Sequence, residues 1–212
     1  QGGGSHTAFT AGALERLVPA IARSDASLVG LSGTSGGAMN AVVAWSALLE
    51  EGPGAVPGAL AAFWADLAAR GPLDRIGNGA LVGGMRAASA GLPLVEASPA
   101  QVPGTRLAQR RLRETIEAHV AFDRLPALVG PGCPRLVVGT VDVNGGCFEA
   151  FVDEAITPDV LLASAAVPEL FPAVEMNGHY HWDGLFSQNP PVHELFAVDA
   201  ARKPDELWVL QI

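Results

Sequence analysis

The sequence predicts a single α/β domain, residues 1–212, with a largely parallel central sheet. Short apolar, β-branched stretches alternate along the 212 residues with longer segments whose apolar residues recur every three or four positions. Apolar residues make up 49% of the chain and charged residues 17%, which is enough apolar material for a sizeable core. The length fits one domain, and no internal repeat is evident.

The N-terminal third is predicted to contain three helices and one strand. Apolar spacing predicts a helix from Ala8 to about Arg23, and the short run from Leu28 to Leu31 is predicted to be a buried strand. The segment from Gly36 to Leu49 is rich in Ala and apolar on nearly all sides, which indicates a buried helix. A further helix is expected from roughly Gly58 to Arg70, after a loop rich in Gly and Pro.

The rest of the chain begins with an irregular stretch. Residues 71–105 carry many Gly and Pro residues and no clear periodicity, so we expect a functional flap or a partly disordered segment there. The elements expected after it are a helix from about Arg106 to His119, strands at Leu136–Val143 and Phe148–Val152 that pair across the turn at 144–146, a short helix at Leu161–Ala166 and a strand at Leu207–Ile212. Because the chain begins in a glycine loop and ends within that last strand, we expect a trimmed piece of a longer protein whose ends indicate no localisation.

The charge of the chain argues against a nucleic-acid partner. Its 22 acidic and 13 basic residues give a formal net charge of −9, whereas phosphate backbones are bound by clustered Lys and Arg. An acidic balance leaves lipid substrates open, since interfacial enzymes can dock through apolar surface. The two cysteines, Cys133 and Cys147, form neither a disulfide framework nor a metal-like spacing, and no apolar run reaches the roughly 20 residues of a membrane span.

The strongest functional motif is the GxSxG pentapeptide at 33–37, which lies between the expected strand and the buried helix. A sharp strand-to-helix turn strains the backbone of the serine and projects its hydroxyl outwards, while the flanking glycines leave room for neighbouring backbone. The N-terminus of the following helix favours negative charge beside Ser35. The motif also arises by chance in simple turns, but in this context it predicts that Ser35 is the nucleophile of an acyl-ester hydrolase.

Three consecutive glycines, Gly2, Gly3 and Gly4, lead into the first expected helix. Successive backbone N–H groups in such a loop can point at one spot, which is what an oxyanion hole requires. The alternative, a phosphate-binding loop of a nucleotide protein, is disfavoured because no Lys follows and Thr7 occupies the last position of a GxGxxG pattern. Together with Ser35, the loop is expected to bind the oxyanion of a tetrahedral intermediate.

A partner base for Ser35 is harder to identify from the residues alone. Among the histidines, His119 lies on a polar helix, and His179 and His181 belong to an expected hairpin where surface positions are the default. Asp183 follows aromatic residues and precedes a glycine, so a desolvated and therefore more basic carboxylate could accept the serine proton directly. The alternative is an aspartate that merely opens a turn.

Four blocks, in order along nearly the whole chain, resemble the patatin-like phospholipase family, most of all its bacterial branch. They are Gly-Gly-Gly-Ser-His-Thr-Ala-Phe at 2–9, Gly-Thr-Ser-Gly-Gly-Ala-Met-Asn-Ala at 33–41, Ala-Ser-Ala-Ala-Val-Pro-Glu-Leu-Phe-Pro-Ala-Val at 163–174 and Trp-Asp-Gly-Leu-Phe-Ser-Gln-Asn-Pro-Pro at 182–191. The resemblance implies a three-layer α/β/α fold and a Ser–Asp dyad, Ser35 with Asp183, without a catalytic histidine. It also implies an oxyanion loop at 2–4, no metal or organic cofactor, a lipid or other acyl-ester substrate and peripheral contact with a membrane.

Some residues of these blocks need separate comment. Pro168, Phe171 and Pro172 match a family block that we expect to shape the site. Thr7 stands where the family usually has Gly, and Leu185 stands beside the expected base where the family has Gly or Ala. In addition, His6 replaces the Arg or Lys common elsewhere in the family; it can still donate a hydrogen bond.

The sequence leaves two other functions open. An α/β-hydrolase triad of Ser35, Asp183 and His193 is one, although the spacing between the acid and the histidine is short for that fold. A non-catalytic lipid-binding domain of the same fold is the other, and Thr7 and Leu185 are the only residues that favour it. The head group and acyl length of the substrate are not indicated.

Overall fold

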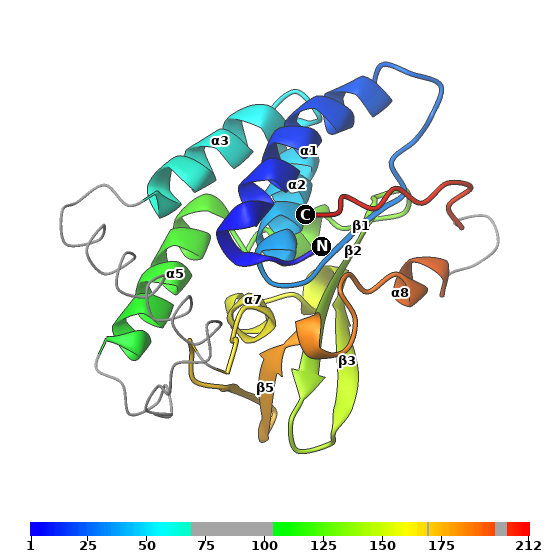
Figure 1. Cartoon of the computed structure of the whole chain (residues 1–212). Helices are drawn as coiled ribbons and strands as arrows, with labels where there is room; N and C mark the ends of the chain where they lie inside the picture. Colours follow the sequence, from blue (N-terminus) through cyan, green and yellow to red (C-terminus); the bar gives the residue numbers. More distant parts are fainter. Residues whose placement is uncertain (69–103, 169, 198–202) are drawn as a thin grey trace.

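The computed structural model describes residues 1–68, 104–168, 170–197 and 203–212. The flap expected at 71–105 therefore lies outside the described residues, apart from Gly104 and Thr105. Figure 1 shows helices packed on a small, twisted sheet, with the two ends of the chain close together. The α/β class predicted from the sequence is confirmed.

The described part of the sheet has five strands, and their pairing brings two strand ends together. The strands are β1 (Gly30–Gly33), β2 (Arg135–Asp142), β3 (Cys147–Val152), β4 (Val174–Met176) and β5 (His179–Asp183). β1 pairs with residues 135–138 of β2, β5 pairs with residues 140–142, and β3 pairs with 137–142. Because a strand has only two edges, β1 and β5 must share the edge of β2 opposite β3. Their C-terminal ends therefore face each other across Gly139.

The expectation of a largely parallel sheet is wrong for the described strands. Only the β1–β2 pair is parallel, whereas the β2–β3, β2–β5 and β4–β5 pairs are antiparallel. For two of these pairs the reason is local: tight turns, not crossover helices, join β2 to β3 and β4 to β5, and a tight turn permits only antiparallel pairing. The β2–β5 pair joins strands that are about 40 residues apart, so no local turn sets its direction. The hairpin expected between residues 136 and 152 is confirmed.

The helices occur mostly where the sequence predicts them. They are α1 (Ala8–Ile21), α2 (Gly36–Glu51), α3 (Val56–Leu67), α5 (Thr105–His119), α6 (Leu125–Leu128), α7 (Pro158–Ser164) and α8 (His193–Phe196), with 3₁₀ turns η1 (Gly4–Thr7), η3 (Asp153–Ala155) and η4 (Gly184–Phe186). Helix α7 begins three residues earlier than expected because Thr157 caps it, its hydroxyl accepting a hydrogen bond from the Val160 N–H at 3.3 Å.

Helices cover both faces of the sheet at β1. A Cβ on Gly33 would meet the backbone of α2 at 2.5 Å, whereas one on Gly30 would meet Leu195 of α8 at 2.8 Å. Side chains three positions apart on a strand point to opposite faces, so α2 and α8 lie on opposite sides. The larger layer holds the core, in which the Ala-rich α2 is buried on nearly all sides, as predicted, against Phe63 and Leu60 of α3.

The strand expected at Leu207–Ile212 is wrong. These residues have no regular secondary structure, although they run beside residue 1, whose backbone nitrogen donates to the Leu210 carbonyl at 3.1 Å. One hydrogen bond does not make a ladder, so the apolar pattern alone does not produce a strand here. Among the described residues, no helix is both long and apolar enough to cross a bilayer.

Candidate active site

Ser35 occupies a strained turn between β1 and α2. Its backbone angles are φ 55° and ψ −130°, a conformation that residues other than glycine rarely adopt. The turn closes tightly, since a Cβ on Gly33 would lie 2.5 Å from the Gly37 carbonyl oxygen. The Ser35 residue is buried, with 6% of its surface exposed. The GxSxG motif therefore forms the strand–turn–helix that the sequence predicts.

A second serine holds this turn in place. Ser164, at the end of α7, is fully buried, and its hydroxyl accepts a hydrogen bond from the Ser35 backbone N–H at 3.0 Å. The same hydroxyl donates to the Gly139 carbonyl of β2 at 2.7 Å. Since both groups lie where water is excluded, these bonds fix the strained turn to the centre of the sheet.

Asp183 is the last residue of β5, which ends opposite the C-terminal end of β1 along the edge of β2. It is fully buried, and its backbone N–H donates to the Ala166 carbonyl at 3.0 Å. Its Oδ1 accepts from the Leu185 N–H at 2.9 Å, whereas Oδ2 is buried without a hydrogen-bond partner of standard geometry among the described residues. The next residue must be glycine, because the backbone of Gly184 packs closely on β2 and a Cβ there would lie 2.6 Å from the Gly139 carbonyl oxygen.

The carboxyl group of Asp183 is a much weaker acid than an ordinary aspartate. Burial raises its pKa from 3.8 to about 6, because desolvation disfavours the charged form. The Leu185 N–H and the Ser35 side chain act in the opposite direction and lower the pKa. The Asp183 oxygen that the Leu185 N–H does not hold, Oδ2, has no hydrogen-bond partner among the described residues.

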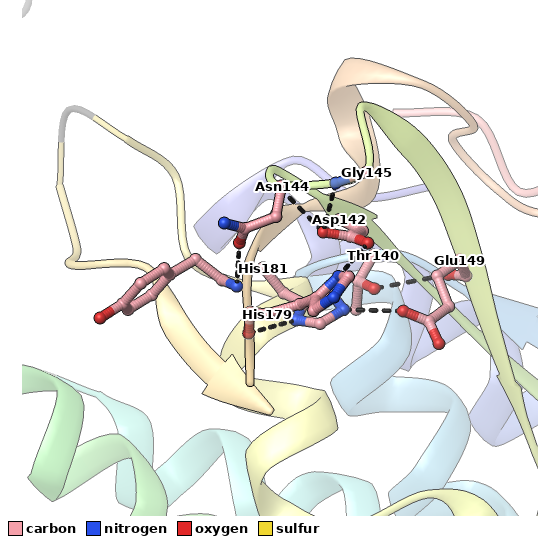
Figure 2. A network of polar contacts seen from close by, with 8 residues as sticks. Thr140, Asp142, Asn144, Gly145, Glu149, His179 and His181 are labelled. Atoms are coloured by element: carbon pink, nitrogen blue, oxygen red, sulfur yellow. Dashed lines mark hydrogen bonds and ion pairs between the residues drawn. The ribbon is translucent and has the colours of Figure 1, made fainter. Parts of the chain in front are cut away.

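Strand β5 is anchored upstream of Asp183 by two contacts between histidines and carboxylates (Figure 2). His181 Nε2 lies 2.7 Å from Glu149 Oε2 on β3, and His179 Nδ1 lies 2.6 Å from Asp142 Oδ2 on β2. The Gly145 N–H and then the His179 ring lower the pKa of the Asp142 carboxyl. His179 is exposed as expected, but the surface position expected for His181 is wrong, since only 2% of it is exposed.

The glycine loop packs directly on the serine turn. A Cβ on Gly2 would lie 2.8 Å from the Ser35 Cβ, and Gly4 has a positive φ of 57°. The Gly2 N–H is already engaged, since it donates to Asn189 Oδ1 at 2.6 Å. Within the described residues, the N–H groups of Gly3 and Gly4 have no hydrogen-bond partner, so these two amides are available to a ligand.

The structure shows the contacts of Thr7, His6 and Leu185, the three residues that differ from the usual family blocks. Thr7 is buried, and its hydroxyl donates to the Gly4 carbonyl at 2.7 Å, so it fastens the glycine loop. His6 is exposed, with Nδ1 3.3 Å from the Gly3 carbonyl oxygen. The Leu185 side chain is 39% exposed, while its N–H, which any residue except proline could supply, holds Asp183.

Two anchors of the site were not identified from the sequence. Ser164 is the polar residue at the end of an otherwise apolar run, Leu161 to Ala163, and that isolated hydroxyl is a usable signal for a buried hydrogen bond. Asn189 holds Gly2 on both sides, because its Nδ2 also donates to the Gly2 carbonyl at 3.3 Å. Only the folded chain brings residues 2 and 189 together, so no local pattern could reveal this pair.

The geometry defines an α/β protein that presents a buried serine on a strand–turn–helix beside a buried carboxyl group and a glycine loop. Residues 1–196 match the model of the patatin-like phospholipase family, and the chain therefore belongs to that family. The family is one of hydrolases that act on lipid esters. No curated protein sequence matches the chain significantly. In the part of the chain that the structure describes, no cluster of three or more His, Cys, Asp or Glu could hold a metal ion.

Proposed function

We propose that the protein hydrolyses lipophilic acyl esters through a dyad of Ser35 and Asp183. Asp183 takes the proton of the Ser35 hydroxyl, and the serine oxygen attacks the ester carbonyl carbon. The negative charge moves to the carbonyl oxygen, where the Gly3 and Gly4 N–H groups are the available donors. Gly2, also expected in the oxyanion loop, contributes by placing that loop, since its own N–H is bound to Asn189.

The tetrahedral intermediate collapses when the bond to the leaving alcohol breaks. The alcohol oxygen takes the proton from Asp183, and the acyl group stays on Ser35 as an ester. A water molecule then gives a proton to the same carboxylate and attacks this ester. The acid product leaves, and the proton returns to Ser35, so the cycle consumes one water and needs no cofactor.

The single observation that supports this mechanism most is a buried carboxyl at the end of β5, opposite the end of β1 that leads into Ser35, with one oxygen that has no hydrogen-bond partner among the described residues. The alternative triad lacks such support. His193 is exposed at the start of α8, and within the described residues its ring has no hydrogen bond to Asp183 or Ser35. A histidine in a triad would be held between these two side chains.

Comparing two variants separates the dyad from the triad. We expect Ser35→Ala to lose turnover of acyl esters and His193→Ala to stay within about twofold of the wild type, because His193 touches no reacting group. The measurement is kcat/KM on esters of different acyl length and head group. Loss of activity in His193→Ala would contradict the dyad, and turnover by no ester at all would favour a non-catalytic lipid-binding domain.

Apolar side chains around the site support a lipid substrate. Phe9 follows the glycine loop and is 66% exposed, and Leu185 and Phe186, directly after Asp183, are 39% and 54% exposed. Exposed aromatic and aliphatic side chains next to a site suit contact with acyl chains or a membrane surface. We therefore propose peripheral membrane contact, and we expect esters to be cleaved in preference to peptides.

Removing the hydroxyl of Ser164 is expected to lower kcat, because this hydroxyl positions Ser35 and does not itself contact the substrate. In Ser164→Ala the buried Ser35 N–H loses its acceptor, so the turn relaxes and kcat falls about 10- to 100-fold, with a stability loss of about 1–3 kcal/mol. Ser46→Ala is the matched control, because Ser46 is also a buried serine but bonds to Glu50 within α2 at 3.3 Å. Equal kcat values for the two variants would show that Ser164 has no role in positioning Ser35.

A further inference from the structure

Helix α5 carries an unusual concentration of positive charge for this chain. Four of the 13 Lys and Arg residues fall within eight positions: Arg106, Arg110, Arg111 and Arg113. The rest of the chain is strongly acidic, as the net charge of −9 records. Arg106, Arg110 and Arg113 are spaced by four and three residues, which places them on the same face of the helix.

These three arginines line a hollow between α5, α7 and the start of β4. Its volume is about 360 Å³, and Leu162 of α7 and Val174 of β4 form its apolar wall. One wall is fixed by Gln109, whose Nε2 donates to the Pro172 carbonyl at 3.2 Å. Figure 1 shows α5 lying beside α7, which ends at the Ser164 that holds Ser35.

Among the described residues, two of these three arginines have no acidic partner. Arg113 is held by Glu117 at 3.3 Å and by Asp159 of α7. Across the described ranges, neither Arg106 nor Arg110 forms an ion pair or a side-chain hydrogen bond, and both are exposed. Like charges four residues apart repel each other on a helix, so this pair lowers the stability of α5 unless an anion lies between them.

The start of α5 adds to this unfavourable charge. Its first turn contains no acidic residue, and its N-cap, Gly104, supplies no capping side chain. The positive end of the helix dipole and Arg106 therefore lie together, an arrangement that an acidic side chain would normally relieve. Among the residues that the structure describes, this charge has no acidic counterpart, so an anionic ligand would relieve it.

We propose that the pocket lined by Arg106, Arg110 and Arg113 binds a phosphate oxyanion. Guanidinium groups bind phosphate through paired N–H donors, and the apolar wall accommodates the carbon skeleton that carries the phosphate. The same chemistry is offered by the head group of an anionic phospholipid and by free phosphate. Binding here is separate from the ester chemistry at Ser35 and does not require it.

The experiment measures binding without turnover, on the Ser35→Ala protein. Its probes are inorganic phosphate and vesicles of phosphatidylcholine, alone or mixed in equal parts with phosphatidylglycerol. The test variant adds Arg106→Gln and Arg110→Gln. The matched control adds Arg16→Gln and Arg23→Gln, which removes the same charge from two exposed residues in and just after α1. Circular dichroism verifies that each variant is folded.

We expect the Arg106→Gln/Arg110→Gln protein to lose about tenfold or more in affinity, and the control to stay within about twofold. Binding of phosphatidylglycerol vesicles without free phosphate supports a lipid head group as the ligand. Binding of inorganic phosphate that competes with the vesicles supports the same site with free phosphate as a second ligand. Wild-type affinity in the test variant, an equal loss in the control, or binding of neither probe would overturn the proposal.

Discussion

Replacing Asp183 with asparagine is expected to abolish most ester turnover while making the folded protein more stable above about pH 6. An amide cannot accept the proton of Ser35, so the loss in kcat/KM should be at least about 10³-fold. The hydrogen bond from the Leu185 N–H persists, because the asparagine side-chain oxygen replaces Oδ1. The variant therefore keeps the shape of the site and removes only its base.

The gain in stability follows from the sign of the pKa shift. Burial raises the pKa of Asp183 from 3.8 to about 6, so the folded chain binds the proton more tightly than the unfolded chain. The stabilisation from this proton is complete below 3.8 and is lost as the pH rises through about 6. At neutral pH the buried charge then costs about 3 kcal/mol, which asparagine does not incur.

Thermal or urea unfolding at about pH 4 and about pH 8 measures this effect. At the higher pH, the unfolding midpoint of Asp183→Asn should lie above that of the wild type. At the lower pH, the two midpoints should lie much closer together. Asp123→Asn, a change of the same charge at an exposed position, serves as the control and should change little at either pH. An Asp183→Asn variant that is less stable at both values would mean that the charged carboxylate is well solvated or paired.

The second large effect expected is a loss of activity at low pH, caused by protonation of the same Asp183 carboxyl group. The base must be ionised, and its pKa is raised to about 6 by burial. Activity should therefore be constant above about pH 7 and fall about tenfold for each pH unit below 6. With the pKa of an ordinary aspartate, 3.8, the fall in activity would begin about two pH units lower. Activity at pH 4 would then be higher by about two orders of magnitude.

The measurement is the pH dependence of kcat/KM with a neutral, non-titrating ester, since this quantity reports the free enzyme. Preincubation at each pH followed by assay at neutral pH separates ionisation from unfolding. A fall in kcat/KM centred near pH 4 would show that Asp183 is solvated. A fall centred near pH 6.5 that is absent from the His193→Ala variant would assign the proton transfer to that histidine.

Local patterns predicted the nucleophile turn well because everything it needs is close in sequence. A strand, two flanking glycines and an apolar helix lie within residues 28–49, and the strained φ of Ser35 follows from them. The helices were predicted for the same reason: α2 is rich in Ala and apolar on nearly all sides, α5 carries Arg and Glu on its outer face, and both begin within a residue of the predicted positions. Asp183 was found through its sequence block, not from spacing.

What the sequence could not reveal depends on contacts between distant residues. Whether β5 runs parallel or antiparallel to β2 is decided by partner strands that are about 40 residues apart, and the apolar pattern of a buried strand is the same in both cases. The burial of His181 depends on Glu149, and the fixing of Gly2 depends on Asn189. Leu207–Ile212 has a strand-like composition, but a strand also needs a partner edge.

Covalent labelling with a fluorophosphonate tests most directly whether Ser35 is the nucleophile and Asp183 its base. The label forms a stable ester with an activated serine, and peptide mass mapping identifies the modified residue. We expect one label per chain, on Ser35, formed more slowly below about pH 6, much more slowly in Asp183→Asn and absent from Ser35→Ala. Labelling of another residue, or an unchanged labelling rate in Asp183→Asn, would contradict the proposed dyad.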